Sequence, residues 1–160
     1  IIKLVHQLKF AEKISYARSI GEMLLTRFVQ DLLPEQGRPD CLLPVALHVS
    51  RLRQRGFNQS TEIARVIAKK LGIPIDYDTV IRQRRTVSQT GLKAKQLRKN
   101  IRDAFCVTVD TSYKHVLIVD DVVTTGSTVN ELAKEMDSKP IDILLACQNM
   151  VKSNLVQFKR

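Results

Sequence analysis

The sequence predicts an α/β protein in which helices flank a mainly parallel central sheet. The clearest observation is a run of apolar residues, Val116–Val119, which is typical of a strand buried on both faces. The second is that such short apolar segments alternate along the chain with segments whose apolar residues recur at helical spacing. The 160 residues suffice for one core, and we expect a single domain over residues 1–150 with a tail at 151–160.

The first quarter of the chain predicts a long helix followed by a short strand. Apolar residues recur at helical spacing within Glu12–Leu33, and we expect Pro34 to end that helix because proline lacks a backbone N–H. Cys41–Leu47 is a short apolar segment of the kind that forms a strand. Since Pro44 inside it cannot donate to a regular ladder, the segment indicates a strand end that turns into a loop.

The next two segments predict a polar connection and a second helix. Arg51–Asn58 is polar and basic, and Gly56 provides a hinge within it. Ser60–Leu71 has its apolar residues aligned on one helical face, and Gly72 directly after it is a typical stop signal.

The second half predicts short strands, a long loop and one more helix. Thr79–Ile81 and Asp103–Val109 predict strands on either side of Gln83–Asn100, which is polar and lacks apolar periodicity. We expect this intervening segment to be a long mobile loop, and loops of that length in a compact domain usually serve function. His115–Val119 and Ile141–Ala146 predict further strands. The helix between them has its apolar residues at i, i+3, i+4 and i+7: Val129, Leu132, Ala133 and Met136.

Composition excludes several classes of protein. Hydrophobic residues make up 44% of the chain, but no apolar run approaches the length of a bilayer span, and no signal peptide is apparent. The cysteines Cys41, Cys106 and Cys147 lack the paired spacing of a zinc site or a disulfide framework. Because each lies in or beside an apolar segment, we expect buried thiols and a protein of the reducing cytoplasm.

Basic residues are concentrated in two segments. The net charge is +10, from 26 basic and 16 acidic residues. Arg82–Arg102 holds eight cations and no acid, and Arg51–Arg55 holds three arginines. Such clusters serve nucleic acid, a polyphosphate ligand or solubility alone, and the sequence leaves these alternatives open.

Two acids and a turn of small residues follow the apolar run Val116–Val119. Asp120 and Asp121 come first, and a helical pattern opens directly after the turn. A small-residue turn entering a helix presents unpaired backbone N–H groups and the positive end of the helix dipole, which suit a phosphate. The adjacent acids suit sugar hydroxyls or a metal ion, so the pattern predicts a ligand such as a ribose 5-phosphate. The residues of the turn are Thr124, Thr125, Gly126, Ser127 and Thr128.

A simpler interpretation of the same pattern is a buried strand, a helix capped by Ser127 or Thr128, and two solvated acids. It accounts for the cap but not for adjacent acids together with five small residues. The pattern is not a P-loop, which needs Gly-Lys-Ser/Thr, nor a dinucleotide-binding turn, which needs GxGxxG.

Residues Val116–Thr128 resemble the ribose-phosphate signature of type I phosphoribosyltransferases, and other stretches resemble one branch of that group, the ComF/GntX family. The most discriminating stretch is an RxRGFNQ motif, whose residues also suit a turn, a core anchor and a helix cap. The resemblance covers nearly the whole chain. The motif comprises Arg53, Arg55, Gly56, Phe57, Asn58 and Gln59, and the other stretches are Leu4–Phe10, Arg85–Gln89 and Ala104–Phe105.

The resemblance implies the type I phosphoribosyltransferase fold and a site for phosphoribosyl pyrophosphate (PRPP). It implies that Asp120 and Asp121 bind the ribose hydroxyls, one of them through Mg²⁺, and that the Thr124–Thr128 turn holds the 5-phosphate. Pyrophosphate is implied to bind the backbone amides of Val45, Ala46 and Leu47. The flexible basic lid that would close over it is implied to include Arg84, Arg85, Lys93 and Arg98.

This sequence departs in two respects from the families that it resembles. Thr124 stands where many purine-salvage relatives have an acid that touches the base, and a threonine is neither acid nor base at neutral pH, which argues against purine salvage. The Cys-rich zinc module that often precedes ComF-like domains is not in this sequence, so we expect no zinc here. Because the chain starts at Ile1 without a methionine, we expect it to be a piece of something longer.

The sequence therefore predicts a PRPP-binding phosphoribosyltransferase (a pentosyl-transferring glycosyltransferase) with an unidentified acceptor. One alternative is a competence-related protein of DNA uptake that binds single-stranded DNA or PRPP without catalysis, in contact with the competence machinery. Aromatic residues make up only 5% of the chain and are absent from Arg82–Arg102, which is poor for stacking on bases. A weaker alternative is a regulator that binds PRPP as an effector.

Overall fold

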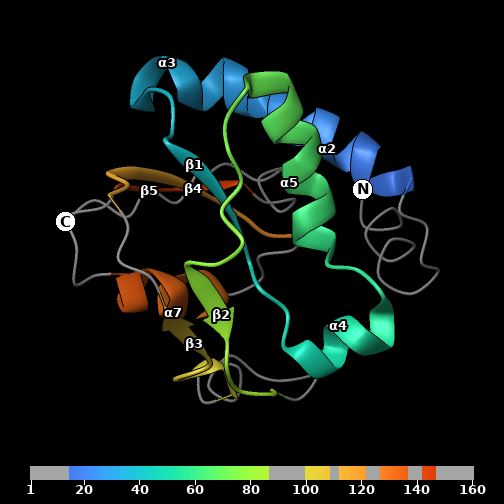
Figure 1. Ribbon diagram of the computed structural model, residues 1–160. Helices are drawn as coiled ribbons and strands as arrows, with labels where there is room; N and C mark the ends of the chain where they lie inside the picture. The colour runs from blue at the N-terminus through green and yellow to red at the C-terminus, as the bar shows by residue number, and fades with distance from the viewer. Residues whose placement is uncertain (1–14, 87–99, 109–111, 122–126, 137–141, 147–160) are drawn as a thin grey trace.

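The computed structural model describes residues 15–86, 100–108, 112–121, 127–136 and 142–146 (Figure 1). Its helices are α2 Ser15–Arg27, α3 Leu33–Gln36, α4 Val49–Arg55, α5 Gln59–Leu71 and α7 Ser127–Met136, with a π-helix, η1, at Phe28–Leu32 between α2 and α3. Its strands are β1 Cys41–Pro44, β2 Val80–Arg82, β3 Phe105–Val107, β4 His115–Val119 and β5 Asp142–Ala146.

The central sheet is parallel, with the strand order β1-β4-β5, which confirms the predicted fold class. The register places Cys41 opposite Val116 and Pro44 opposite Val119, so β1 and β4 end at the same edge. β2 and β3 form a separate antiparallel pair, an arrangement that the sequence did not predict. The two paired strands β1 and β4 lie far apart in the sequence.

Helices cover both faces of this sheet, as Figure 1 shows: α2 and α5 lie on one side and α7 on the other. Leu117 and Val119 of β4 pack in the same cluster as the buried residues of α2 and α5. Val116 and Ile118 point to the opposite cluster, which contains the buried face of α7. Because both faces of β4 are buried, its sequence is a continuous apolar run rather than an alternating one.

Close contact between α2 and α5 depends on a glycine in the middle of α2. A Cβ atom added at Gly21 would lie 2.7 Å from the Cβ of Val66, which is nearer than packed carbon atoms approach. Glycine therefore allows the two helix backbones to come together where a larger residue would hold them apart.

The predicted end of the first helix at Pro34 is wrong. The chain passes from α2 through η1 into α3, and Pro34 is the second residue of α3. In the first helical turn the missing N–H of proline has no partner to lose, so the residue is tolerated there. The helical segment ends instead at Gly37, whose φ of +79° is left-handed and whose N–H donates to the carbonyl of Leu33 at 3.1 Å.

The segment predicted as a polar connection with a hinge contains a helix, α4. His48 caps its start, where Nδ1 accepts from the Ser50 N–H at 3.2 Å. Gly56 caps its end in the left-handed conformation, with its N–H donating to the carbonyl of Leu52 at 2.8 Å. None of the α4 residues is buried, so the helix has no apolar stripe and no periodic signal in the sequence.

The other predicted elements are confirmed with small changes in their ends. α5 begins at Gln59 and ends at Leu71, and Gly72 caps it in the left-handed conformation, as the stop signal indicated. α7 buries Val129, Leu132 and Met136, three of the four residues that its spacing predicted. Within the described residues, no helix combines the length and the apolar character that crossing a bilayer requires.

Candidate active site

The two predicted acids lie buried at the end of the middle strand of the sheet. Asp120 and Asp121 follow β4 directly and are only 8% and 9% exposed. The Oδ1 atom of Asp120 accepts from the N–H of Asp121 at 2.9 Å and, more weakly, from the hydroxyl of Ser60 at 3.4 Å. The interpretation of two solvated acids is therefore wrong. Adjacent buried carboxylates are costly to keep, which is typical of groups that serve a ligand.

The helix expected to follow the small-residue turn is α7, and it begins at Ser127. Ser127 and Thr128 form its first turn and are half-buried, whereas Thr124, Thr125 and Gly126 lie outside the described residues. The N-terminal end of α7 thus follows the acids by a few residues, and the helix dipole makes that end positive. The role of the turn between the acids and the helix start stays a prediction.

The segment after β1 lies beside the end of β4, where the resemblance places pyrophosphate. The N–H of Val45 donates to the carbonyl of Val119 at 2.9 Å, so this amide continues the sheet. Val45 is buried, and Ala46 and Leu47 are half-buried. Because the amide of Val45 is engaged in the sheet, the predicted pyrophosphate contact falls to Ala46 and Leu47.

The RxRGFNQ motif forms a corner that fixes this segment against α5. The Nδ2 atom of Asn58 donates to the carbonyl of Val45 at 3.0 Å, and its Oδ1 accepts from the N–H of Ser60 at 3.1 Å as the cap of α5. Phe57 packs in the core cluster of α2 and α5, as a core anchor should. Through Ser60, the same corner reaches Asp120. The turn, anchor and cap expected of the motif are all present.

The last residue of the motif, Gln59, is buried, and only one end of its side-chain amide forms a hydrogen bond with a described residue. Its Oε1 accepts from Nη1 of Arg55 at 2.9 Å, which fixes the orientation of the amide because arginine can only donate. It is 1% exposed, and its Nε2 has no hydrogen-bond partner within the described part of the chain. Arg53 is exposed on α4.

The predicted basic lid is only partly within the described residues. Lys93 and Arg98 lie outside them, whereas Arg84 and Arg85 are described and exposed. Nη2 of Arg84 donates to the carbonyl oxygens of Asn100 and Arg102, which joins the two ends of the basic segment.

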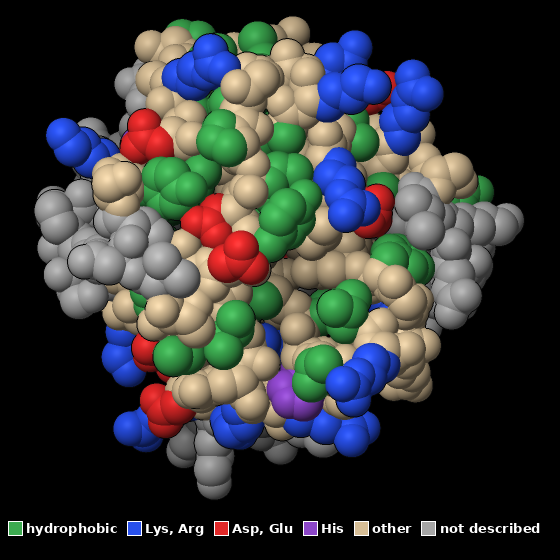
Figure 2. Space-filling model, viewed as in Figure 1, with side chains coloured by type: hydrophobic (Ala, Val, Ile, Leu, Met, Phe, Trp, Pro, Cys, Tyr) green, Lys and Arg blue, Asp and Glu red, His purple; other side chains and the backbone are tan. Residues whose placement is uncertain are grey.

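Arg82, which the sequence counted only among the cations of the basic segment, is buried at the end of β2. It is 9% exposed, and its Nη2 donates to Oγ1 of Thr86 at 2.6 Å. Burial, followed by the positive charge of Arg51, lowers the pKa of Arg82 to about 10. Burial also lowers the pKa of Arg51, with further contributions from Arg55 and Arg85. Cations therefore crowd this end of the molecule. Figure 2 shows Lys and Arg side chains along the lower edge, where Figure 1 places α4, and others at the upper right.

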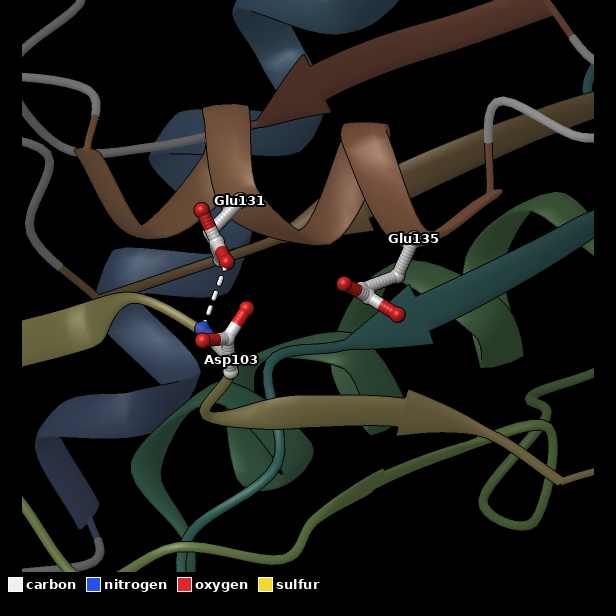
Figure 3. A group of neighbouring side chains, drawn as sticks. All are labelled: Asp103, Glu131 and Glu135. Carbon is white, nitrogen blue, oxygen red and sulfur yellow. Dashed lines mark hydrogen bonds between the residues drawn. The ribbon is translucent and has the colours of Figure 1, made fainter.

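A second acidic group was missed because its members come from distant elements. Figure 3 shows Asp103, before β3, facing Glu131 and Glu135 of α7, with carboxylate oxygens that lie within 4.8 Å of one another. The N–H of Asp103 donates to Oε1 of Glu131 at 2.7 Å, and Arg102 is 3.6 Å from the carboxylate of Asp103. The group therefore fastens the start of β3 to α7.

Comparison with known proteins assigns this arrangement to a family. The phosphoribosyl transferase domain family matches residues 58–152, which include α5, the two acids and α7. A solved glutamine phosphoribosylpyrophosphate amidotransferase from B. subtilis has a TM-score of 0.48 at 17% identity, covering 81% of this chain and 25% of that one.

Curated relatives extend the match toward the amino terminus. The DNA utilization protein YhgH of Salmonella typhi is 38% identical over 136 residues, covering 82% of this chain and 58% of the relative. Competence protein F of Haemophilus influenzae is 33% identical over 135 residues, covering 82% of this chain and 59% of the relative. The chain thus spans less than two thirds of the length of these relatives. It belongs to the phosphoribosyl transferase domain family, has the type I phosphoribosyltransferase fold, and is similar to the DNA utilization protein YhgH and to Competence protein F.

Proposed function

We propose that this domain binds PRPP and transfers its phosphoribosyl group to an acceptor, with release of pyrophosphate. The observation that carries the proposal is the buried pair Asp120 and Asp121 at the carboxyl end of the middle strand of a parallel sheet. Ligands of open parallel sheets bind at that edge. A family match that includes both acids supports the same ligand.

The described residues suit the parts of PRPP in order. Carboxylates accept hydrogen bonds, so Asp120 and Asp121 suit the two ribose hydroxyls. The first turn of α7, with Ser127 and Thr128, suits the 5-phosphate, because backbone N–H groups and the helix dipole both favour an anion there. Pyrophosphate has two proposed sets of partners. They are the backbone amides of Ala46 and Leu47, and the basic side chains of Arg84 and Arg85.

Adjacent carboxylates also fit a divalent cation. Mg²⁺ prefers oxygen ligands and is usually held by one or two carboxylates together with substrate phosphates, which matches Asp120 and Asp121 beside a diphosphate. Bound there, Mg²⁺ would neutralise charge on the pyrophosphate. The rest of the work belongs to the protein, which orients the ribose through its hydroxyls and keeps water from the anomeric carbon.

In the proposed reaction the bond between the anomeric carbon and the pyrophosphate oxygen breaks, and its electron pair leaves with pyrophosphate. The acceptor donates an electron pair to the same carbon and forms the new bond. Positive charge develops on the ribose as the first bond lengthens, and a site with fixed carboxylates nearby favours that charge.

Binding can be tested by thermal unfolding of the domain with PRPP and Mg²⁺. At a ligand concentration one hundred times its Kd, the free energy of unfolding should rise by about 2.7 kcal/mol, which is a clear increase in Tm. Ribose 5-phosphate with Mg²⁺ should give a smaller shift, because it lacks the diphosphate. The absence of any shift with millimolar PRPP and Mg²⁺ would overturn the proposal.

A second candidate function is binding of single-stranded DNA, which the names of the curated relatives suggest. The observation in its favour is the set of α4 arginines, Arg51, Arg53 and Arg55, which form no ion pair among the described residues. Such binding should weaken with salt, by about 0.7 in the slope of log affinity for each phosphate contacted. Replacing Arg53 and Arg85 by Ala should then reduce the slope. Equal salt slopes for the variant and the wild type would count against DNA.

A further inference from the structure

Arg82 is a buried cation whose hydrogen bonds are incomplete. It lies at the end of β2 with its guanidinium carbon 5.4 Å from the centre of the Phe105 ring, and it donates from Nη2 to Thr86. Its Nε is buried and has no partner among the residues that the structure describes. Buried N–H groups of arginine are normally satisfied, and a charged one is the most costly to leave open. The described residues thus leave this donor without an acceptor.

The positive charges around Arg82 are only partly balanced by Asp120. Burial and the neighbouring cations Arg51 and Arg84 lower its pKa, while Asp120 acts in the opposite direction. A pKa of about 10 still leaves Arg82 positive at neutral pH. The ion pairs in the described part of the chain involve other arginines, namely Arg18, Arg65 and Arg102. Asp120 is near enough for its negative charge to act on Arg82.

A second arginine converges on the same residue. Nη2 of Arg51, on α4, donates to the carbonyl of Thr86 at 2.8 Å, while Arg82 holds the hydroxyl of Thr86. Thr86 is only 4% exposed. Two guanidinium groups from different elements are therefore anchored at one buried threonine (the elements are shown in Figure 1). Arginine forks match the geometry of carboxylate and phosphate oxygens, so this placement suits an oxyanion.

We propose that Arg82, with Arg51 beside it, binds an oxyanion of a substrate at the site of Asp120. This inference rests on the proposed function, since it assumes that a substrate occupies that edge of the sheet. Two sources share the chemistry: the diphosphate of PRPP, and a carboxylate carried by the acceptor. The second source makes the acceptor an acidic one.

A purely structural role makes the opposite prediction about stability. If Arg82 serves only to hold Thr86 and stack on Phe105, its removal must destabilise the protein without ligand. If it is kept for an oxyanion, removing a buried charge that the protein only partly balances should leave the ligand-free protein as stable or more stable, and only anion binding should suffer.

The test compares Arg82→Gln, Arg82→Lys and Arg51→Gln with the wild type and with Arg65→Gln, which removes an equal charge from an exposed pair with Glu62. Tm is measured without ligand, and affinity by calorimetry for inorganic pyrophosphate, for PRPP with Mg²⁺, and for pyridine-2-carboxylate against neutral pyridine. We expect Arg82→Gln to keep its Tm and to lose at least tenfold in affinity for one anion, with a smaller loss in Arg82→Lys and none in Arg65→Gln.

The anion that is lost identifies the source. A loss confined to pyrophosphate and PRPP assigns Arg82 to the diphosphate, and a loss confined to the carboxylate assigns it to the acceptor. A lower Tm for Arg82→Gln with every affinity within twofold of the wild type overturns the inference. If Arg82→Gln does not fold, unchanged affinities in Arg82→Lys and Arg51→Gln overturn it equally.

The inference and the proposed function fail in different ways. Wild-type protein that binds pyrophosphate through Arg82 but does not bind PRPP with Mg²⁺ would refute the function and keep the oxyanion site. Wild type and Arg82→Gln that bind PRPP, pyrophosphate and the carboxylate equally well would refute the oxyanion site and keep the function.

Discussion

At the scale of single residues, Asn58 joins two parts of the site with one side chain. Its oxygen caps α5 and its nitrogen holds the carbonyl of Val45, beside the end of β4. The variant Asn58→Asp separates these two roles, because a carboxylate caps a helix well but cannot donate a hydrogen bond to the Val45 carbonyl.

We expect Asn58→Asp to lose about 1–2 kcal/mol of unfolding free energy, through the lost bond and the repulsion between the carboxylate and the Val45 carbonyl. PRPP affinity should fall more than this stability change alone explains, since the segment after β1 is no longer held. Urea unfolding and calorimetry measure the two effects. Asn58→Ser, which also caps, is the neutral control, and wild-type affinity in both variants would show that the bond does not position the site.

The acidic pair gives a second prediction at this scale. Replacing Asp120 and Asp121 together by Asn removes two adjacent buried charges but keeps oxygens that can accept from Ser60 and from the backbone. The ligand-free variant should be as stable as the wild type or more so, by up to about 2 kcal/mol, and should no longer bind PRPP. Thermal unfolding with and without PRPP and Mg²⁺ reads out both. If the variant does not fold, Asp120 and Asp121 have a structural role.

A third residue, Asp40, ties the start of β4 in a way that depends on pH. Its Oδ2 accepts from the N–H groups of Lys114 and His115 at 2.8 and 2.9 Å, and these bonds lower its pKa from 3.8. A lowered pKa in the folded state means stability that is present above about pH 4 and lost as the pH falls through the folded pKa.

Asp40→Asn keeps an acceptor and removes the charge, so it should be slightly less stable than the wild type at pH 7. The effect should be small because the side chain is exposed, and the difference should disappear in acid. Urea unfolding of both proteins from pH 7 down to pH 2 measures this. A difference that stays constant over the whole range would assign it to something other than the charge.

At the scale of elements, the α2–α5 contact sets helix propensity against packing. Gly21→Ala should favour the helix by about 1 kcal/mol, yet its new Cβ would lie 2.7 Å from Val66 Cβ. We expect a net loss of about 1–3 kcal/mol of unfolding free energy.

The double variant Gly21→Ala with Val66→Ala should recover only part of this loss, because it removes the contact with Val66 Cγ1 at 2.9 Å but keeps the contact with the Cβ of residue 66. Chemical unfolding of both single variants and the double variant gives the coupling energy directly. Strictly additive effects would mean that the backbones, not the side chains, set the helix spacing.

Elements with a buried face were predictable, and those without one were not. β4 and α5 carry the apolar patterns of their burial, so their sequences predict them. α4 has no buried residue, and only its caps, His48 and Gly56, define it. The three residues of β2 are too few to distinguish a strand in the main sheet from one in a separate pair.

At the scale of the whole molecule, the sequence predicts those parts of the site whose residues are close together along the chain. Asp120 and Asp121 are neighbours, and the strand before them and the helix after them have clear patterns. Contacts with Ser60 and the buried position of Arg82 depend on segments that only the folded chain brings together. A sequence motif can report such contacts only indirectly, as the corner at Asn58 does.

The pairing of β1 with β4 has a consequence for how the chain is made. Cys41 and Val116 are partners in the sheet although 75 positions separate them (116 minus 41). As the ribosome releases the chain, β1 emerges with a completely apolar surface and an open backbone edge, and it must wait for β4. Long-range parallel pairing of this kind folds slowly. A nascent chain stalled before β4 is therefore an aggregation-prone intermediate. It lacks Asp120 and Asp121, so a ligand that binds these carboxylates cannot stabilise it, and chaperones must protect it during synthesis.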